Sequence, residues 1–354
     1  MSVWNRKTMA KNCCIVCARL IVIMVLLTPI RSQLFSTDFD FGDYHDLTEI
    51  YREMKYLAYR YRSIAKVKSI GRSYEGRQML VLKVSTSSGS SRKPIIWIQA
   101  GLHAREWISQ ATAVCLMERL VRHYSTELSI QSLVEEFDFY VLPVANPDGY
   151  VQTWIENRKH RKNMNFPPGV ECEREKDTLG VDLNRNFDFD FNGEGSSQNP
   201  CDYNYAGESA FSEPETRNIR TFLTRYVPNH EIAAFIDLHS FSQLIAYPYN
   251  HKRNTYPVNK RELVDVAIDM QKRIRRLFGS GYSTGSGADY MYRMSGTATD
   301  WARKELNVTY PFMIELRPRE PLSNQSGFIL DKREILPTCE EIWEGLGAIF
   351  DRLL

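Results

Sequence analysis

The sequence lacks an excess of charge of either sign. Its 45 Lys and Arg residues nearly balance 43 Asp and Glu residues, which leaves a formal net charge of +2 at pH 7. This balance gives no reason to expect nucleic acid or an acidic membrane surface as a partner. The 354 residues show no internal repeat or low-complexity tract, and 43% of them are hydrophobic. The composition therefore indicates a globular protein with a sizeable core.

The sequence also lacks an uninterrupted apolar run of the roughly 20 residues that span a bilayer. The apolar segment at 15–27 is shorter, contains Arg19 and follows several basic residues. A basic segment before a short apolar one predicts a secretory signal peptide at 1–32, with a signal anchor as the alternative. The C-terminal residues 351–354 carry no hydrophobic tail or lipidation signal, so the C-terminus gives no support for membrane tethering.

Cysteine is scarce outside the predicted signal peptide. Of seven cysteines, three fall within it, and the remaining four are Cys115, Cys172, Cys201 and Cys339. In a secreted chain, four cysteines allow two disulfides with three possible connectivities. Cys172 and Cys201 flank a loop-rich region and are the favoured pair, whereas the alternative for Cys115 is a buried thiol in an apolar helix. Glycosylation sequons at Asn307 and Asn324 agree with a secreted, extracellular protein.

Apolar runs and helical periodicity alternate along the chain. Strands are predicted at 65–70, 78–85, 94–99, 137–144, 232–238, 244–248 and 311–316. Helices are predicted at 47–62, 108–124, 258–278 and 335–353, with a further start at Ser212. This alternation predicts an α/β fold in one domain, a mixed, largely parallel twisted sheet of about eight strands with helices on both faces. Residues 146–149 predict a turn, and a long irregular stretch of a kind that is usually functional follows to about residue 211.

Two of the predicted strands end in side chains that can bind a metal. His103 and Glu106 lie in the loop after the strand at 94–99, and His239 closes the strand at 232–238. The carboxyl ends of neighbouring parallel strands meet at one edge of a sheet, where ligands bind. Two imidazoles, a carboxylate and a water form the ligand set of a catalytic zinc. Taken alone, the His-x-x-Glu pair fits a strand-end histidine and a salt-bridging glutamate better than a metal site.

Further polar groups stand in unexpected places. Glu315 ends an apolar strand, where a carboxylate is costly to bury without a partner, and a salt bridge with Arg317 is the alternative. Arg158 and Arg161 belong to a basic cluster that would otherwise be a solvated surface. The polar run at 182–186 interrupts the long loop. Two tyrosines, Tyr290 and Tyr292, follow a glycine-rich segment.

Together these motifs resemble the zinc metallocarboxypeptidases of the pancreatic A/B type. The resemblance extends from about residue 44 to the end of the chain, and 44–354 is accordingly expected to be the catalytic domain. The motifs that carry it are Gly101-Leu102-His103-Ala104-Arg105-Glu106-Trp107, Asn146-Pro147-Asp148-Gly149-Tyr150, Glu156-Asn157-Arg158, Gly180-Val181-Asp182-Leu183-Asn184-Arg185-Asn186-Phe187, Leu238-His239-Ser240-Phe241-Ser242-Gln243 and Glu315-Leu316-Arg317.

The resemblance implies a zinc-dependent enzyme that removes the C-terminal residue of peptides and proteins. One Zn²⁺ per chain would be bound by His103, Glu106 and His239, leaving a position for water. Glu315 would be the general base that activates this water, and zinc and Arg161 would stabilise the oxyanion. An imidazole ligand would be held by Asp182.

The resemblance also implies how the substrate is bound. Its C-terminal carboxylate would be held by Asn184, Arg185 and Tyr292, with Tyr292 on a mobile lid. Subsites upstream of the scissile bond would be lined by Arg105 and Arg158. Thr299 would form the floor of the specificity pocket, and its lack of charge disfavours basic C-terminal residues. Neutral or acidic residues are expected instead, with Arg293 or Lys252 as the possible sources of acidic selectivity.

One departure from the digestive members of the family concerns the N-terminus. Only a short lead-in at 33–43 separates the predicted signal peptide from the domain, so no activation prodomain is expected. On that ground the sequence most resembles the carboxypeptidase O type, and an active monomer is expected without proteolytic activation. The alternatives are a catalytically weak peptide-binding relative and a zinc amidohydrolase, and the intact ligand positions and carboxylate-binding residues disfavour both.

Overall fold

The computed structural model describes residues 39–86, 92–170, 172, 179–227, 231–321 and 326–354. Residues 40–354 form one compact unit. The predicted signal peptide at 1–32 and most of the lead-in at 33–43 lie outside the described residues, and so does the sequon residue Asn324. None of the helices within the described ranges has the length and apolar character needed to cross a membrane.

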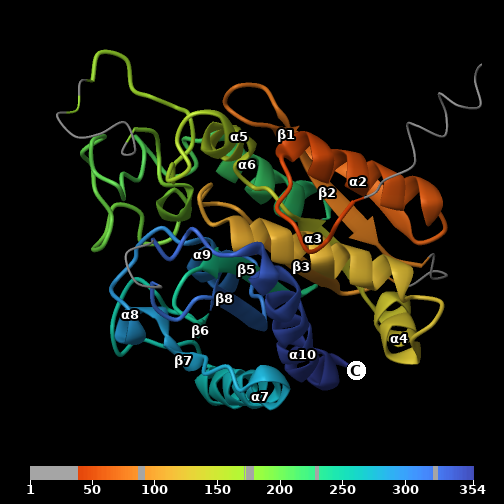
Figure 1. Cartoon of the computed structure of the whole chain (residues 1–354). Coiled ribbons are helices and arrows are strands. Elements are labelled where there is room, and N and C mark those ends of the chain that lie inside the picture. Colours follow the sequence, from red (N-terminus) through yellow and green to blue (C-terminus); the bar gives the residue numbers. More distant parts are fainter. Residues whose placement is uncertain (1–38, 87–91, 171, 173–178, 228–230, 322–325) are drawn as a thin grey trace, which may run out of the picture. The chain divides into compact units, whose positions relative to one another are not determined.

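The centre of this unit is an eight-stranded mixed sheet, as predicted (Figure 1). Its strand order is β1-β2-β4-β3-β5-β8-β6-β7, and the four central strands β4, β3, β5 and β8 run parallel. The strands are β1 (Ala65–Arg72), β2 (Gln78–Val84), β3 (Ile95–Ala100), β4 (Asp138–Leu142), β5 (Ile232–Ser240), β6 (Leu244–Tyr247), β7 (Ser283–Ser286) and β8 (Tyr310–Leu316). Every residue of β3, β5 and β8 is buried, which explains their apolar sequences. The short polar strand β7 was not predicted.

Helices cover both faces of the sheet. On one face, Phe139 of β4 contacts Phe350, and Cys115 and Cys339 link two of the helices. On the other, the neighbouring Tyr140 belongs to a core that includes Ile219 and Trp301. The α-helices are α2 (Leu47–Arg60), α3 (Trp107–Arg122), α4 (Leu128–Glu136), α5 (Pro147–Ile155), α6 (Pro214–Thr221), α7 (Lys260–Phe278), α8 (Gly287–Tyr290), α9 (Ala298–Glu305) and α10 (Ile335–Leu353). Short turns of other helix types lie at Leu183–Arg185, Phe222–Tyr226 and Lys332–Glu334.

The predicted turn at 146–149 is instead the start of helix α5. Asn146 caps this helix, since its side chain accepts a hydrogen bond from the backbone N–H of Gly149 (3.0 Å). Pro147 occupies the first helical position, where its fixed φ is favourable and no backbone donor is needed. The same residues therefore serve as a helix N-terminus, and the irregular stretch begins only after Ile155.

Two disulfides are present in the described residues. Cys172 pairs with Cys201, as favoured from the sequence. Cys115 of α3 pairs with Cys339 of α10, so the alternative of a buried thiol at Cys115 is wrong. Helical periodicity placed Cys115 on a buried face but could not identify a partner 224 residues away.

Replacing Cys115 and Cys339 together by alanine is expected to lower the free energy of unfolding by roughly 2–5 kcal/mol, since the crosslink restricts the unfolded chain. The matched control is the double alanine variant of Cys172 and Cys201, whose loop of 29 residues is shorter. The decrease in its free energy of unfolding should be smaller by about 2 kcal/mol than that of the variant lacking Cys115 and Cys339. Urea unfolding measures both, and equal losses would contradict loop length as the cause.

Candidate metal centre and active site

The parallel strands bring the predicted metal ligands together. His103 and Glu106 follow β3, and His239 lies near the end of the adjacent strand β5. Glu315 of β8 stands directly opposite His239 in the next strand pair. Residues paired in this way point to the same face of a parallel sheet, so the sheet register places Glu315 beside the predicted ligands.

The ligand atoms of His103, Glu106 and His239 converge on one point. His103 Nδ1 lies 2.9 Å from Glu106 Oε1 and 3.1 Å from His239 Nδ1. His239 Nδ1 lies 3.0 Å from Glu106 Oε2. Tetrahedral zinc with ligands at about 2.05 Å requires separations of about 3.3 Å, close to those observed. Among the described residues, this is the group of His, Cys, Asp and Glu side chains that can hold a metal ion.

The other nitrogen of each imidazole faces a buried carboxylate. Nε2 of His103 donates to Asp182 Oδ1 (3.0 Å), and Nε2 of His239 lies 3.0 Å from Asp237 Oδ2. For His103 this arrangement leaves Nδ1 unprotonated and able to bind a metal. Nε2 of His239 also lies 3.3 Å from the side-chain amide nitrogen of Asn184. The predicted role of Asp182 fits this geometry. The matching role of Asp237 was missed, although its position two residues before His239 on one strand face was a usable signal.

The charges of the centre compensate one another. Burial acts to raise the pKa of Glu106, but the two imidazoles outweigh it and hold that pKa below its usual range. Burial likewise acts to lower the pKa of Arg161, and the carboxylates of Asp182 and Glu106 raise it instead. Arg161 donates to Asp182 Oδ2 from Nε (3.2 Å) and Nη2 (2.9 Å), so the guanidinium stays charged beside the ligands.

Glu315 is 8% exposed and faces the same cavity. It does not form the alternative salt bridge, because Arg317 pairs with Glu334 and Glu341. Burial, followed by the charge of Glu106, raises the pKa of Glu315 to about 8. A cation bound by the neighbouring ligands would favour the ionised form, which is the form that accepts a proton.

A cavity of about 200 Å³ opens over these groups. It brings together most of the predicted site residues, namely His103, Arg105, Glu106, Arg161, Asn184, Arg185, Tyr292 and Glu315. Its lining also includes Tyr203, Phe241 and Phe328, and three methionines, Met291, Met294 and Met313. None of these six was assigned a role from the sequence.

The guanidinium of Arg185 is held in place by the protein. It donates to the backbone carbonyls of Gly195 (3.0 Å) and Asn184 (2.7 Å) and lies 3.5 Å from the hydroxyl of Tyr292. The side-chain oxygen of Asn184 accepts from the backbone N–H of Ala298 (2.9 Å). Asn184, Arg185 and Tyr292 are thus adjacent, as binding of one carboxylate requires.

Two predicted substrate-binding residues do not line the cavity. Arg158 donates to the backbone carbonyls of Arg105 (2.8 Å) and Phe328 (2.6 Å) and lies over the Trp107 ring at 3.7 Å. Thr299 is 1% exposed and accepts from the side-chain amide of Asn250 (2.9 Å).

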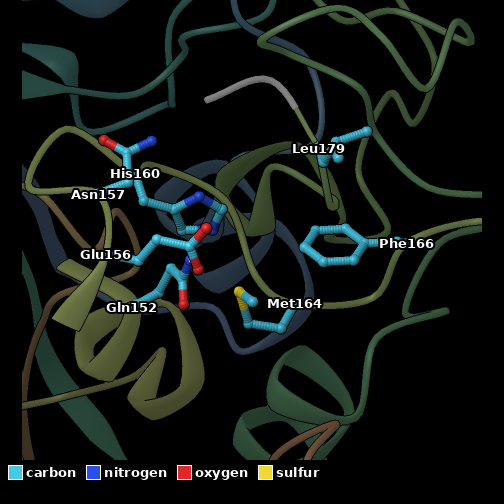
Figure 2. A pocket seen from close by; sticks show the side chains of 7 residues that line it. All are labelled: Gln152, Glu156, Asn157, His160, Met164, Phe166 and Leu179. Atoms are coloured by element: carbon cyan, nitrogen blue, oxygen red, sulfur yellow. The ribbon is translucent and has the colours of Figure 1, made fainter. Parts of the chain in front are cut away.

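A separate cavity of about 430 Å³ lies beside α5 and the segment before Arg161. Figure 2 shows its lining, which consists of Gln152, Glu156, Asn157, His160, Met164, Phe166 and Leu179. His160 therefore faces this cavity, whereas Arg161, the next residue, faces the candidate active site. Neither the metal-ligand group nor Glu315 lines the larger cavity, so size alone does not identify the site.

The profile of the zinc carboxypeptidase family matches residues 50–345. This chain belongs to the zinc carboxypeptidase family. Carboxypeptidase A2 of Mus musculus is 39% identical over 338 residues, which cover 94% of this chain and 77% of that relative. Carboxypeptidase O of Homo sapiens is 34% identical, with 88% of this chain and 80% of the relative covered.

Solved structures agree with this membership. Bovine thrombin-activatable fibrinolysis inhibitor, solved in complex with tick carboxypeptidase inhibitor, superposes with a TM-score of 0.78 at 34% identity. The match covers 88% of this chain and 98% of that chain. The predictions of the family, the mixed α/β fold, a metallocarboxypeptidase hydrolase and zinc as its cofactor are therefore confirmed.

Changing Asp237 to Asn should weaken zinc binding by this carboxypeptidase roughly 10- to 100-fold, because the carboxylate orients the His239 ring. Competition with a chromophoric chelator measures the affinity. Asp138→Asn is the control, since Asp138 is also buried but pairs with Lys83. An unchanged zinc affinity in Asp237→Asn would show that His239 needs no such support.

The segment after Arg161 is held by a buried carboxyl group that should make stability depend on pH. Glu215 accepts from the Tyr74 N–H (2.9 Å) and from the Asn163 side chain (3.2 Å). Burial raises its pKa from 4.5 to about 7, so the folded state binds a proton that the unfolded state releases. The protonated Glu215 carboxyl contributes its full stabilisation of the folded state below pH 4.5. This contribution is lost as the pH rises to 7.

Glu215→Gln should therefore gain up to roughly 3 kcal/mol relative to the wild type between pH 4 and pH 7.5. Denaturant unfolding at both pH values measures the difference. The exposed Glu305, changed to Gln, is the control. Parallel pH profiles for wild type and Glu215→Gln would contradict the assignment.

Proposed function

We propose that this zinc carboxypeptidase cleaves the C-terminal peptide bond of peptides and proteins with Glu315 and Arg161 as its catalytic residues. The observation that carries the proposal is that a group of three side chains able to bind a metal, of which His103 and Glu106 line the cavity, adjoins a fixed guanidinium in that cavity that is suited to a free carboxylate. An exopeptidase needs both, because it must recognise the chain end and activate water beside the last peptide bond.

The side chains around the scissile peptide bond then have distinct roles. His103, Glu106 and His239 would hold the zinc ion, which when bound would supply the Lewis acidity that lowers the pKa of water and polarises a carbonyl group. Glu315 accepts a proton from the attacking water and delivers it to the leaving amine. The Arg161 guanidinium donates to the oxygen on which negative charge develops, and its bonds to Asp182 keep it oriented for that purpose.

The substrate carboxylate is bound by Arg185 with Asn184 and Tyr292. The two carbonyl acceptors of Arg185 fix the orientation of its planar donor set before substrate arrives. The hydroxyl of Tyr292 adds a donor on the exposed side of the cavity. Arg105, stacked on the Phe328 ring at 4.0 Å, is placed to contact residues further upstream.

The terminal side chain is neutral in the preferred substrates. The inner part of the cavity is lined by Met294 and Met313, which are 3% and 1% exposed and carry no charge to offset a buried ammonium. Arg293, one candidate for acidic selectivity, forms an ion pair with Glu194 and does not line the cavity. Basic residues are accordingly the poorest substrates, and neutral residues are favoured over acidic ones.

The two disulfides support a location in an oxidising compartment, as expected of a secreted protein. The signal peptide at 1–32, the absence of an activation prodomain and the monomeric state stay predictions. An N-terminal sequence of the mature protein and its mass in solution would test them.

The proposed activity is tested with N-blocked dipeptides that end in Leu, Phe, Glu, Lys or Arg. The protein, without protease pretreatment, should release the terminal residue, with Leu and Phe fastest and Lys and Arg slowest. A zinc chelator should abolish release, and added zinc should restore it. Stoichiometric zinc binding without release from any substrate would favour the peptide-binding alternative.

Glu315→Gln should lower kcat by at least about 100-fold, because the amide cannot accept the proton. Zinc content measured by atomic absorption should stay at one per chain, since Glu315 is not among the grouped ligand atoms. His239→Ala, which removes a ligand, is the comparison variant and should lose both zinc and activity. Retention of wild-type kcat by Glu315→Gln would exclude Glu315 as the general base.

A further inference from the structure

Tyr203 is an exposed aromatic residue at the mouth of the active-site cavity. Its side chain lines that cavity although 54% of the residue is exposed to solvent. Within the described parts of the chain, its side chain has no hydrogen bond or ring contact that would explain its position. A large aromatic ring in this place is free to contact a substrate.

The backbone around Tyr203 is fixed at several points. Cys201 is crosslinked to Cys172, and the buried ammonium of Lys162 donates to the carbonyls of Pro200 (3.2 Å) and Asp202 (2.7 Å). These two carbonyls lie on either side of Cys201, and one belongs to the residue before Tyr203. The loop therefore presents the ring from a rigid base, which lowers the entropy cost of a contact with substrate.

The same loop adjoins the carboxylate-binding residues. The side chain of Asn204 donates to the carbonyl of Gly195 (3.1 Å), which also accepts from Arg185 Nε (3.0 Å). Tyr203 thus lies near Arg185, on the solvent side of the cavity. In the proposed binding mode, the terminal side chain of a substrate held by Arg185 would enter the buried end at Met294 and Met313. The preceding residue would then lie toward the solvent side of the cavity, where the exposed ring of Tyr203 is placed.

We propose that Tyr203 is a specificity-determining residue that stacks on the penultimate side chain of the substrate and favours aromatic and large apolar groups there. The proposal rests on the proposed exopeptidase function. Lys162 is the positioning residue for this contact, since it acts on substrate only through the loop that carries Tyr203.

The test compares two N-blocked dipeptides that share a terminal Leu and differ in the penultimate residue, Phe or Gly. Tyr203→Ala should lower kcat/KM roughly three- to tenfold for Phe-Leu and leave Gly-Leu unchanged. Tyr203→Phe, which keeps the ring, should behave as the wild type. The matched control is Tyr290→Ala, because Tyr290 is 57% exposed but does not line the cavity.

Lys162→Met should lower kcat/KM for Phe-Leu as Tyr203→Ala does, and it should have little effect on kcat/KM for Gly-Leu. The double variant with Tyr203→Ala should lose no more than Tyr203→Ala alone, since both changes remove one contact. If Lys162 had only a structural role, Lys162→Met would instead lower kcat/KM equally for both substrates.

Equal losses on Phe-Leu and Gly-Leu in Tyr203→Ala, or no loss on either, would overturn the proposal. Wild-type protein that is active, together with a Tyr203→Ala variant that keeps the wild-type ratio of kcat/KM for Phe-Leu over Gly-Leu, contradicts this inference alone. Zinc-loaded wild-type protein that is inactive on every substrate contradicts the proposed function on which the inference rests.

Discussion

The buried carboxylate of Asp182 is the constraint on which the site depends. One of its oxygens accepts from His103 Nε2 and from the backbone N–H of Asn184, and the other accepts from Arg161. It fixes a metal ligand, a cation and the turn that presents Arg185, which come from three separate parts of the chain. Burying this carboxylate is unfavourable unless donors and cations surround it, so the three groups stay together.

The same principle extends from Asp182 to the other charged groups of the site. Arg161 is directed by a carboxylate and Arg185 by two backbone carbonyls, so both guanidinium groups are oriented in the absence of substrate. Substrate does not have to order these long side chains, and less binding free energy is lost to immobilising them. The sheet contributes the third fixed element, because its register sets Glu315 opposite His239.

The parts of the site that could be predicted follow local patterns. His103, Glu106, His239 and Glu315 each lie at or just after the end of a largely apolar run, and parallel strands bring such ends to one edge. The direction of a long side chain is not a local property. Arg158 turns toward backbone carbonyls, one of which lies 170 residues further along the chain. The partner of Cys115 is equally remote, and no periodicity in the sequence encodes it.

The methionines at the inner end of the cavity have a consequence for the range of substrates. Methionine is unbranched and has a polarisable sulfur, so its side chain changes rotamer at little cost and fills space of irregular shape. Met291 is partly exposed, whereas Met294 and Met313 pack against Leu244 and Ala246. Under the proposed function, a pocket built in this way would adapt its outline to the terminal side chain instead of selecting one outline. Flat aromatic rings and branched aliphatic chains would then share a single recess, and discrimination between substrates would depend on the penultimate residue at the mouth of the cavity.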